Sequence, residues 1–170
     1  LRRVVVERQL AEAEEQFRTY AYVAPDQANP HDSLGELLSL VGRYDEARTE
    51  LERSLSIRPD FCASYQHLAG IAVFEGRPEE IPPLAERLGE HCTAEMKAAL
   101  DCEARFFAAF ISRDFDAPWR DGFASCGGKM GGGILLYRLA LLAGRQAEAE
   151  AEEAALAKAV EESAKPSYPK

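Results

Sequence analysis

The feature that most constrains this chain is an internal repeat, with a period of about 34 residues, the length typical of one class of helical repeat. Ala13, Phe17 and Pro25 each have a counterpart of similar size or kind one period later, at Ala47, Leu51 and Pro59. The dipeptide Gly-Arg recurs with the same period, at 42–43, at 76–77 and, two periods later, at 144–145. A fixed period of this length is typical of chains built by stacking one supersecondary unit on the next.

The clearest unit runs from Ala28 to Phe61. Its first half has apolar residues at helical spacing, and Gly42 follows where a helix commonly ends in a left-handed residue. The second half begins with two acidic residues, which the dipole favours in a first helical turn, and Pro59 ends it. The pattern predicts a helix, a tight turn and a second helix, and no segment of the chain has the alternation of a strand.

This unit resembles a tetratricopeptide repeat, through Leu34, Gly35, Gly42-Arg43-Tyr44-Asp45-Glu46-Ala47, Leu55 and Pro59. His31 departs from the family pattern, which has an aromatic residue at this position. The resemblance implies an all-α fold, a right-handed superhelix of antiparallel helix pairs. Gly35 and Ala47 are then expected where the two helices of one repeat cross, because only small side chains allow a close approach.

The rest of the chain fits the same plan as one domain over residues 1–170. Residues 1–25 are expected to form only the second helix of a repeat, as in a segment cut from a longer array. Degenerate repeats follow at 62–92 and 94–126, a terminal repeat or cap at 134–163, and a tail at 164–170. Pro82 and Pro83 predict that the second helix of 62–92 begins late, near Ile81, and Thr93 is the expected cap of the next helix.

Composition excludes some partners. The 20 Lys and Arg against 29 Asp and Glu give a formal net charge of −9, which disfavours binding to nucleic acid. Apolar runs are far shorter than the roughly 20 residues of a membrane span, so no membrane contact is expected. Cys62, Cys92, Cys102 and Cys126 form no Cys-x-x-Cys pair, and we expect free thiols in a reducing, cytoplasmic setting.

Three segments contain residue types that catalysis or ligand binding uses. The glycine-rich stretch 127–133 lacks the glycine and hydroxyl positions of a phosphate loop, so a linker is expected. In His31-Asp32-Ser33, successive side chains point about 100° apart on a helix, so a packed histidine is expected. His91-Cys92, even with Cys102, would still lack a fourth zinc ligand unless the fold brought in Cys62, Cys126 or His67. We therefore predict no enzymatic activity, no cofactor and no metal.

The resemblance also implies a binding surface, because the first helices of tetratricopeptide repeats line a concave groove. Carried over, the groove positions are Asp32, Ser33, Glu36, Leu40, Gln66, His67, Val73 and Phe74. The family subtype that holds a C-terminal carboxylate uses Lys, Asn and Arg at such positions, whereas here they are Asp32-Ser33 and Gln66-His67. This groove would suit a partly apolar, neutral or basic peptide or helix.

Two functions remain open from the sequence. One is a non-catalytic protein-interaction module that binds a peptide or helix in the groove. The other is a structural or regulatory scaffold, which packs against other domains of the same polypeptide or self-associates. Residues 1–25, as an incomplete repeat, would be the homodimer contact in that case, since a lone amphipathic helix leaves apolar surface exposed.

Overall fold

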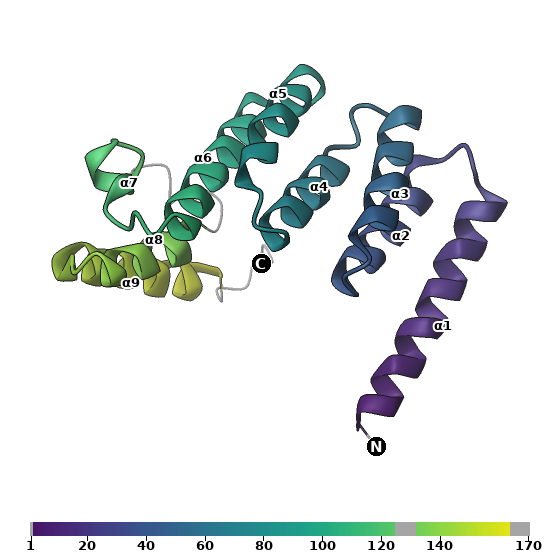
Figure 1. Ribbon diagram of the computed structural model, residues 1–170, viewed down its shortest axis with the longest axis horizontal. Helices are drawn as coiled ribbons and strands as arrows, with labels where there is room; N and C mark the ends of the chain where they lie inside the picture. The colour runs from purple at the N-terminus through teal and green to yellow at the C-terminus, as the bar shows by residue number, and fades with distance from the viewer. Residues whose placement is uncertain (1, 125–131, 164–170) are drawn as a thin grey trace, which may run out of the picture. The chain divides into compact units, whose positions relative to one another are not determined.

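The structure, a computed structural model, describes residues 2–124 and 132–163, with side chains described for 9–124 and 136–161. Over these residues the chain is helical, with no strand, as predicted (Figure 1). The elements are α1 (Arg2–Val23), α2 (Ala28–Leu40), α3 (Tyr44–Ile57), α4 (Cys62–Phe74), the 3₁₀ turn η1 (Pro78–Glu80), α5 (Ile81–His91), α6 (Ala94–Ile111), α7 (Ala117–Arg120), α8 (Gly132–Leu142) and α9 (Gln146–Ser163).

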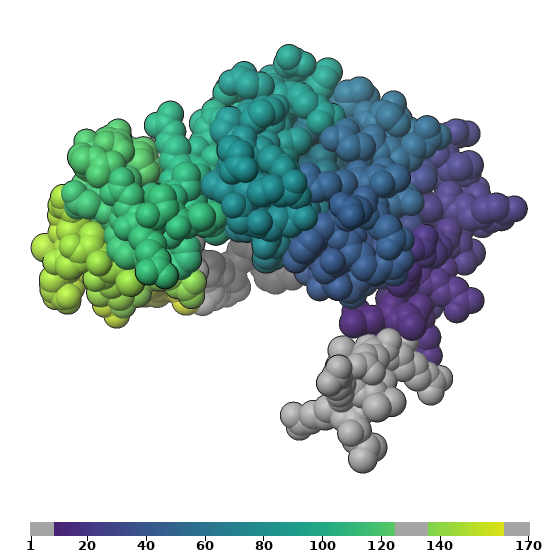
Figure 2. Space-filling view, viewed as in Figure 1, coloured from purple at the N-terminus to yellow at the C-terminus, as the bar shows by residue number. Residues whose placement is uncertain are grey.

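The chain divides into two compact units, residues 1–97 and 98–170. The first holds α1 to α5 and the start of α6, and the second holds the rest of α6 and α7 to α9. The all-α repeat architecture is confirmed, while the single domain and the right-handed superhelix stay predictions. Within the first unit, α1 (purple) lies beside the α2–α3 hairpin (blue) at one end (Figure 2).

One turn geometry closes three of the hairpins in the described chain. At Gly42, Gly76 and Gly144 the φ angle is 80°, 71° and 72°, the left-handed region that favours glycine. The glycine N–H donates to the carbonyl three residues before, and the next N–H donates to the carbonyl five residues before. This double hydrogen bond satisfies carbonyls at the helix end and reverses the chain direction.

Arg113 takes the glycine place in a further turn of the same kind. Its φ is 59°, and its N–H and that of Asp114 make the same pair of hydrogen bonds, to Phe110 and Ala109. The sequence shows no glycine there, so the periodicity alone did not identify this turn. The structure therefore shows that α6 and α7 are joined like the other helix pairs, by a turn that lies slightly more than two periods after Gly42.

The α2–α3 hairpin shows why a small residue is needed at the helix crossing. A Cβ atom added at Gly35 would lie 2.6 Å from Leu51 Cγ and 3.2 Å from the Ala47 carbonyl oxygen. Ala47 and Leu51 are fully buried, and Leu34 and Leu38 complete the core of this hairpin. The predicted crossing at Gly35 and Ala47 is confirmed.

The second hairpin, α4 to α5, corrects the prediction of free thiols. Cys62 and Cys92 form a disulfide, with their Cα atoms 6.1 Å apart. Cys102 is disulfide-bonded as well, whereas Cys126 lies outside the described residues. The prediction was wrong because two cysteines so far apart in the sequence meet only once the hairpin has brought the start of α4 to the end of α5. The expected late start of α5 at Ile81 is confirmed.

The second unit has a core of its own. Cys102 and Phe106 of α6 pack with Phe123 and with Leu139 of α8, and the rings of Phe106 and Phe123 meet edge to face at 5.4 Å. In α9, Ala149 is buried and most other described side chains are exposed, as expected of a terminal cap. Thr93 caps α6 by accepting a hydrogen bond from the Met96 N–H. The glycine-rich stretch lies mostly outside the described residues.

Candidate functional site

The predicted groove residues come from two neighbouring helices, α2 and α4, and three of them meet. His67 Nδ1 of α4 lies 3.2 Å from Asp32 Oδ1 of α2, and His67 Nε2 lies 3.9 Å from Glu36 Oε1. Asp32 and Glu36 are four residues apart and so share one face of α2. The structure therefore places an acidic pair and a histidine side by side between the first helices of two successive repeats.

Asp32 is not a surface residue, although the sequence places it in the groove. Its side chain is buried, and Oδ1 accepts a hydrogen bond from Ser64 Oγ at 2.7 Å. Ser64 Oγ in turn lies 2.9 Å from Ser54 Oγ of α3. Asp32 thus ties α2 to α3 and α4, and its carboxylate is already occupied. The sequence could not show this, because both serines come from other helices.

His67 is the titratable group whose charge this arrangement controls. Its hydrogen bond with Asp32 raises the pKa of the imidazole above its ordinary value, the charge of Glu36 adds to this, and burial opposes it. The His67 side chain keeps 26 % of its surface exposed. The protonated imidazole is therefore more favoured here than in a free histidine, and in that form it neutralises part of the acidic charge of this face.

The other predicted residues form a surface with an acidic and an apolar end. Glu36 and Gln66 are exposed, and Ser33 and Val73 are half-buried. Leu40 is 71 % exposed and Phe74 is 65 % exposed, at the turn ends of α2 and α4. We call Ser33, Glu36, Leu40, Gln66, His67, Val73 and Phe74 the α2/α4 surface.

Tyr44 belongs beside this surface, although the sequence assigned it to the apolar line of α3. Its ring stacks on Phe74, with centroids 6.3 Å apart and ring planes 12° from parallel. The stacking orients Phe74 while leaving most of its ring open to solvent. The signal that could have found Tyr44 was its position directly after the Gly42-Arg43 turn, next to the turn end of the following hairpin.

The same exposed apolar position recurs in both units. Two residues before the turns at Gly42, Gly76, Arg113 and Gly144, the first helices carry Leu40, Phe74, Ile111 and Leu142, with exposed fractions of 71 %, 65 %, 45 % and 53 %. An exposed large apolar side chain is ordinary when it stands alone. Its recurrence at one repeat position is not, and the register of the 94–126 repeat became readable only with the turn at Arg113.

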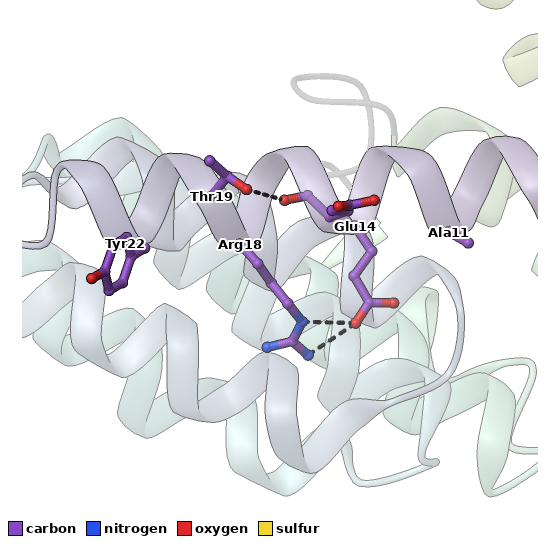
Figure 3. A pocket seen from close by; sticks show the side chains of 6 residues that line it. Ala11, Glu14, Arg18, Thr19 and Tyr22 are labelled. Atoms are coloured by element: carbon purple, nitrogen blue, oxygen red, sulfur yellow. Dashed lines mark hydrogen bonds and ion pairs between the residues drawn. The ribbon is translucent and has the colours of Figure 1, made fainter.

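A shallow depression on α1 is lined by Ala11, Glu14, Glu15, Arg18, Thr19 and Tyr22 (Figure 3). Two of its polar side chains form an ion pair, and a third bonds to the helix backbone. Arg18 donates to Glu14 at 2.9 Å, and Thr19 donates to the Glu15 carbonyl. Arg43 also binds Glu14, at 2.6 Å, and these bonds hold the pKa of Glu14 below its usual range. The depression therefore presents a satisfied ion-pair cluster and no converging reactive groups.

In the described part of the chain, the side chains that could bind a metal or form a hydrolase relay do not come together in a site. No cluster of three His, Cys, Asp or Glu side chains could hold a metal ion there. Ser64, Asp32 and His67 are the residue types of a hydrolase, but Ser64 donates to the aspartate and not to the histidine, so the relay is absent. His31 is buried between Glu50 and the Pro25 carbonyl, which confirms the predicted packed histidine.

The comparisons with known proteins agree with the geometry of the first hairpin. A family profile described as "Tetratricopeptide repeat" matches residues 30–61. No curated protein and no solved structure matches the chain. In the described residues, no helix is both long enough and apolar enough to cross a membrane.

Proposed function

Residues 30–61 are a tetratricopeptide repeat, and on that premise we propose that the chain is a protein-interaction module whose α2/α4 surface binds a peptide or helix. Tetratricopeptide repeats generally mediate contacts between proteins and are typically non-catalytic. We extend both properties to this chain. The observation that carries the proposal is the exposure of Leu40 and Phe74 at equivalent positions of adjacent repeats, beside the acidic Glu36.

The chemistry of the α2/α4 surface defines the ligand. Leu40 and Phe74 offer an apolar contact, which a large apolar side chain of the ligand would cover. Glu36 favours a neutral or basic neighbour, because a carboxylate next to it would be repelled. Asp32 does not take part, since its oxygen is bound to Ser64. We infer a ligand with one or two large apolar side chains followed or preceded by a positive charge.

Other partners and the cellular location follow from charge and from the cysteines. The net charge of −9 supports a protein partner over nucleic acid. The predicted cytoplasmic location rested on free thiols, and the Cys62–Cys92 disulfide removes that support. No residue of the α2/α4 surface needs a cofactor for this function.

Peptide display on the intact chain tests the proposal. Short random peptides are selected on the immobilised protein, and the affinity of a selected peptide is measured by fluorescence polarisation. We expect Phe74→Ala and Leu40→Ala each to weaken binding by about fivefold or more, since a few well-packed side chains carry most of the energy of such contacts. Tyr22→Ala, an exposed aromatic of α1, is the matched control and should not change the affinity. Equal affinities for all three variants would refute the α2/α4 surface as the binding site.

A second function, self-association through α1, is favoured by one observation. Ala47, Leu51 and Ser54 of α3 are fully buried, whereas their counterparts one period earlier, Ala13, Phe17 and Tyr20 of α1, are all partly exposed. In the next repeat, the positions of Ala47 and Leu51 lie against Gly35 of α2, and that of Ser54 lies against Ser64 of α4. A second copy of the chain, or another domain of the same polypeptide, would cover them in α1.

Sedimentation velocity separates the two functions. If the sedimenting mass rises from monomer to dimer as the protein concentration increases, and Tyr20→Lys stays a monomer, then α1 forms a homodimer contact. A constant monomer mass over the accessible concentration range would reject the homodimer. The peptide measurement above is independent of either result, because Leu40 and Phe74 lie on α2 and α4.

A further inference from the structure

The Cys62–Cys92 disulfide encloses one repeat and nothing else. Cys62 is the first residue of α4, and Cys92 follows the last residue of α5. The Gly76 turn closes the other end of the same hairpin, where the Arg77 N–H donates to the Ala72 carbonyl. The α4–α5 hairpin is therefore closed at both of its ends, by a turn at one and by a covalent bond at the other.

The α5 helix is the part of the first unit that gains most from this bond. It has 11 residues against 14 in α3, and Pro82 and Pro83 occupy its first turn. A helix this short is marginal without tertiary support. Its support comes from burying Ile81, Leu84, Ala85 and Leu88. Its tie to α3 is the Arg87–Glu52 ion pair, which is exposed, and exposed ion pairs add little stability. By contrast, α4 packs on α3 and is also held by the buried Ser64–Asp32 hydrogen bond to α2.

We propose that this repeat is an oxidation-dependent element, and that the chain folds and works in a compartment that forms disulfides. In the oxidised chain, the link limits how far α5 can move from α4. A dithiol reductant would give two electrons and two protons to the S–S bond, become a disulfide itself and leave two thiols. The freed α5 would then open locally, while α2 and α3 keep their packing.

Two further observations support an oxidising compartment. Every cysteine of the described chain is disulfide-bonded, Cys102 included. Such complete pairing is typical of chains that mature outside the reducing cytosol. Cys62 and Cys92 are also only half-buried, so that a reducing environment would have access to their bond.

The first test is the redox state of the protein as isolated. The protein is quenched in acid, alkylated without reduction and digested with trypsin. Trypsin does not cleave before proline, so the link should join peptide 54–87 to peptide 88–97. We expect this linked pair and almost no alkylated Cys62 or Cys92. Alkylation of both cysteines in most molecules isolated from the natural source would overturn the proposal that the chain works in a disulfide-forming compartment.

The second test is hydrogen exchange of the whole chain with and without dithiothreitol. Reduction should raise the exchange rates of α5 amides on the order of 10- to 100-fold, because opening a loop of this length regains chain entropy. Amides of α3 should not change. Equal α5 rates in both states would overturn the proposal.

A pair of variants assigns the effect to this disulfide. Cys62→Ser/Cys92→Ser should show the fast α5 exchange even without reductant, whereas Cys102→Ser should keep α5 slow. Fast α5 exchange in Cys102→Ser alone would overturn the assignment. None of these tests uses a peptide ligand, so failure here is distinguishable from failure of the proposed function.

Discussion

The hairpins α2–α3 and α4–α5 have the same type of turn, but their two helices pack against each other differently. In the first, Gly35 leaves room for Leu51 at the crossing, and an added Cβ would come within 2.6 Å of it. One period later the same two positions hold Ala69 and Ala85, both buried. The first crossing therefore pairs a very small residue, Gly35, with a large one, Leu51, whereas the second pairs two small residues. In compensation, the position of Ala47 holds the larger Ile81 in the second hairpin.

The comparison shows that the helix crossing constrains a sum of side-chain volumes more than any one residue. Interiors are packed to near crystal density, so a loss at one position has to be recovered nearby. The tetratricopeptide repeat match covers 30–61, where the crossing holds Gly35 and Ala47, and leaves out 62–92, where the same positions hold Ala69 and Ile81. The second hairpin also adds a covalent closure that the first lacks.

The largest expected effect is that of Leu51→Ala. Leu51 is fully buried against Gly35, so its truncation leaves a cavity beside a residue with no side chain to fill it. We expect the free energy of unfolding of the first unit to fall by about 3 kcal/mol. Hydrogen exchange of α3 amides measures it, and it is the suitable probe because Trp119, the one tryptophan of the sequence, lies in the second unit. A loss below about 1 kcal/mol would show that the crossing is loosely packed.

The double variant Gly35→Ala/Leu51→Ala converts the first crossing into the pair found in the second. The added methyl group fills part of the cavity, and alanine is about 1 kcal/mol better than glycine in a helix. We expect the double variant to be more stable than Leu51→Ala by roughly 1 kcal/mol, while Gly35→Ala alone is destabilising because of the contact with Leu51. Additive losses in this double-mutant cycle would contradict volume compensation.

Asp32→Ala is expected to cost about 2 kcal/mol, because it leaves the buried Ser64 hydroxyl without its carboxylate acceptor. The counterpart of Asp32 in the second hairpin is Gln66, which is exposed, so Gln66→Ala should change stability by less than about 0.5 kcal/mol. Urea unfolding followed by circular dichroism measures both. Equal losses for the two variants would mean that burial at this repeat position has no energetic consequence.

How far the sequence could predict these features depends on where their causes lie. The bounds of α2, α3 and α5 and the cap at Thr93 follow from local signals, namely periodicity, Gly42, the prolines and a hydroxyl. The burial of Asp32 and the Cys62–Cys92 bond depend on partners in other helices, which only the folded hairpins bring near. The left-handed turn at Arg113 was not predicted from the sequence, because glycine is the residue usually found at such a position.

Substituting the turn glycine should lower the stability less than the core substitutions do, and by the same amount in both hairpins. Gly42 and Gly76 have φ angles of 80° and 71° with open space around them, so alanine there meets backbone strain and no clash. We expect Gly42→Ala and Gly76→Ala each to cost about 1 kcal/mol. Arg113→Gly should stabilise the second unit by up to about 1 kcal/mol, measured through Trp119 fluorescence. A neutral result for Gly76→Ala beside a costly Gly42→Ala would mean that the disulfide replaces the turn in the second hairpin.

The smallest effect lies at the junction of the two hairpins, where Asp32 of one binds His67 of the other. Because the pKa of His67 is raised in the folded chain, the pair adds stability that is fully present below the unfolded histidine value of about 6.5. That stability is lost as pH rises through the folded pKa. We expect a slightly higher urea midpoint at about pH 6 than at about pH 8, and a smaller difference in His67→Gln. NMR titration of the three histidines gives the pKa directly, and a His67 value at or below about 6.5 would show that burial outweighs the Asp32 hydrogen bond.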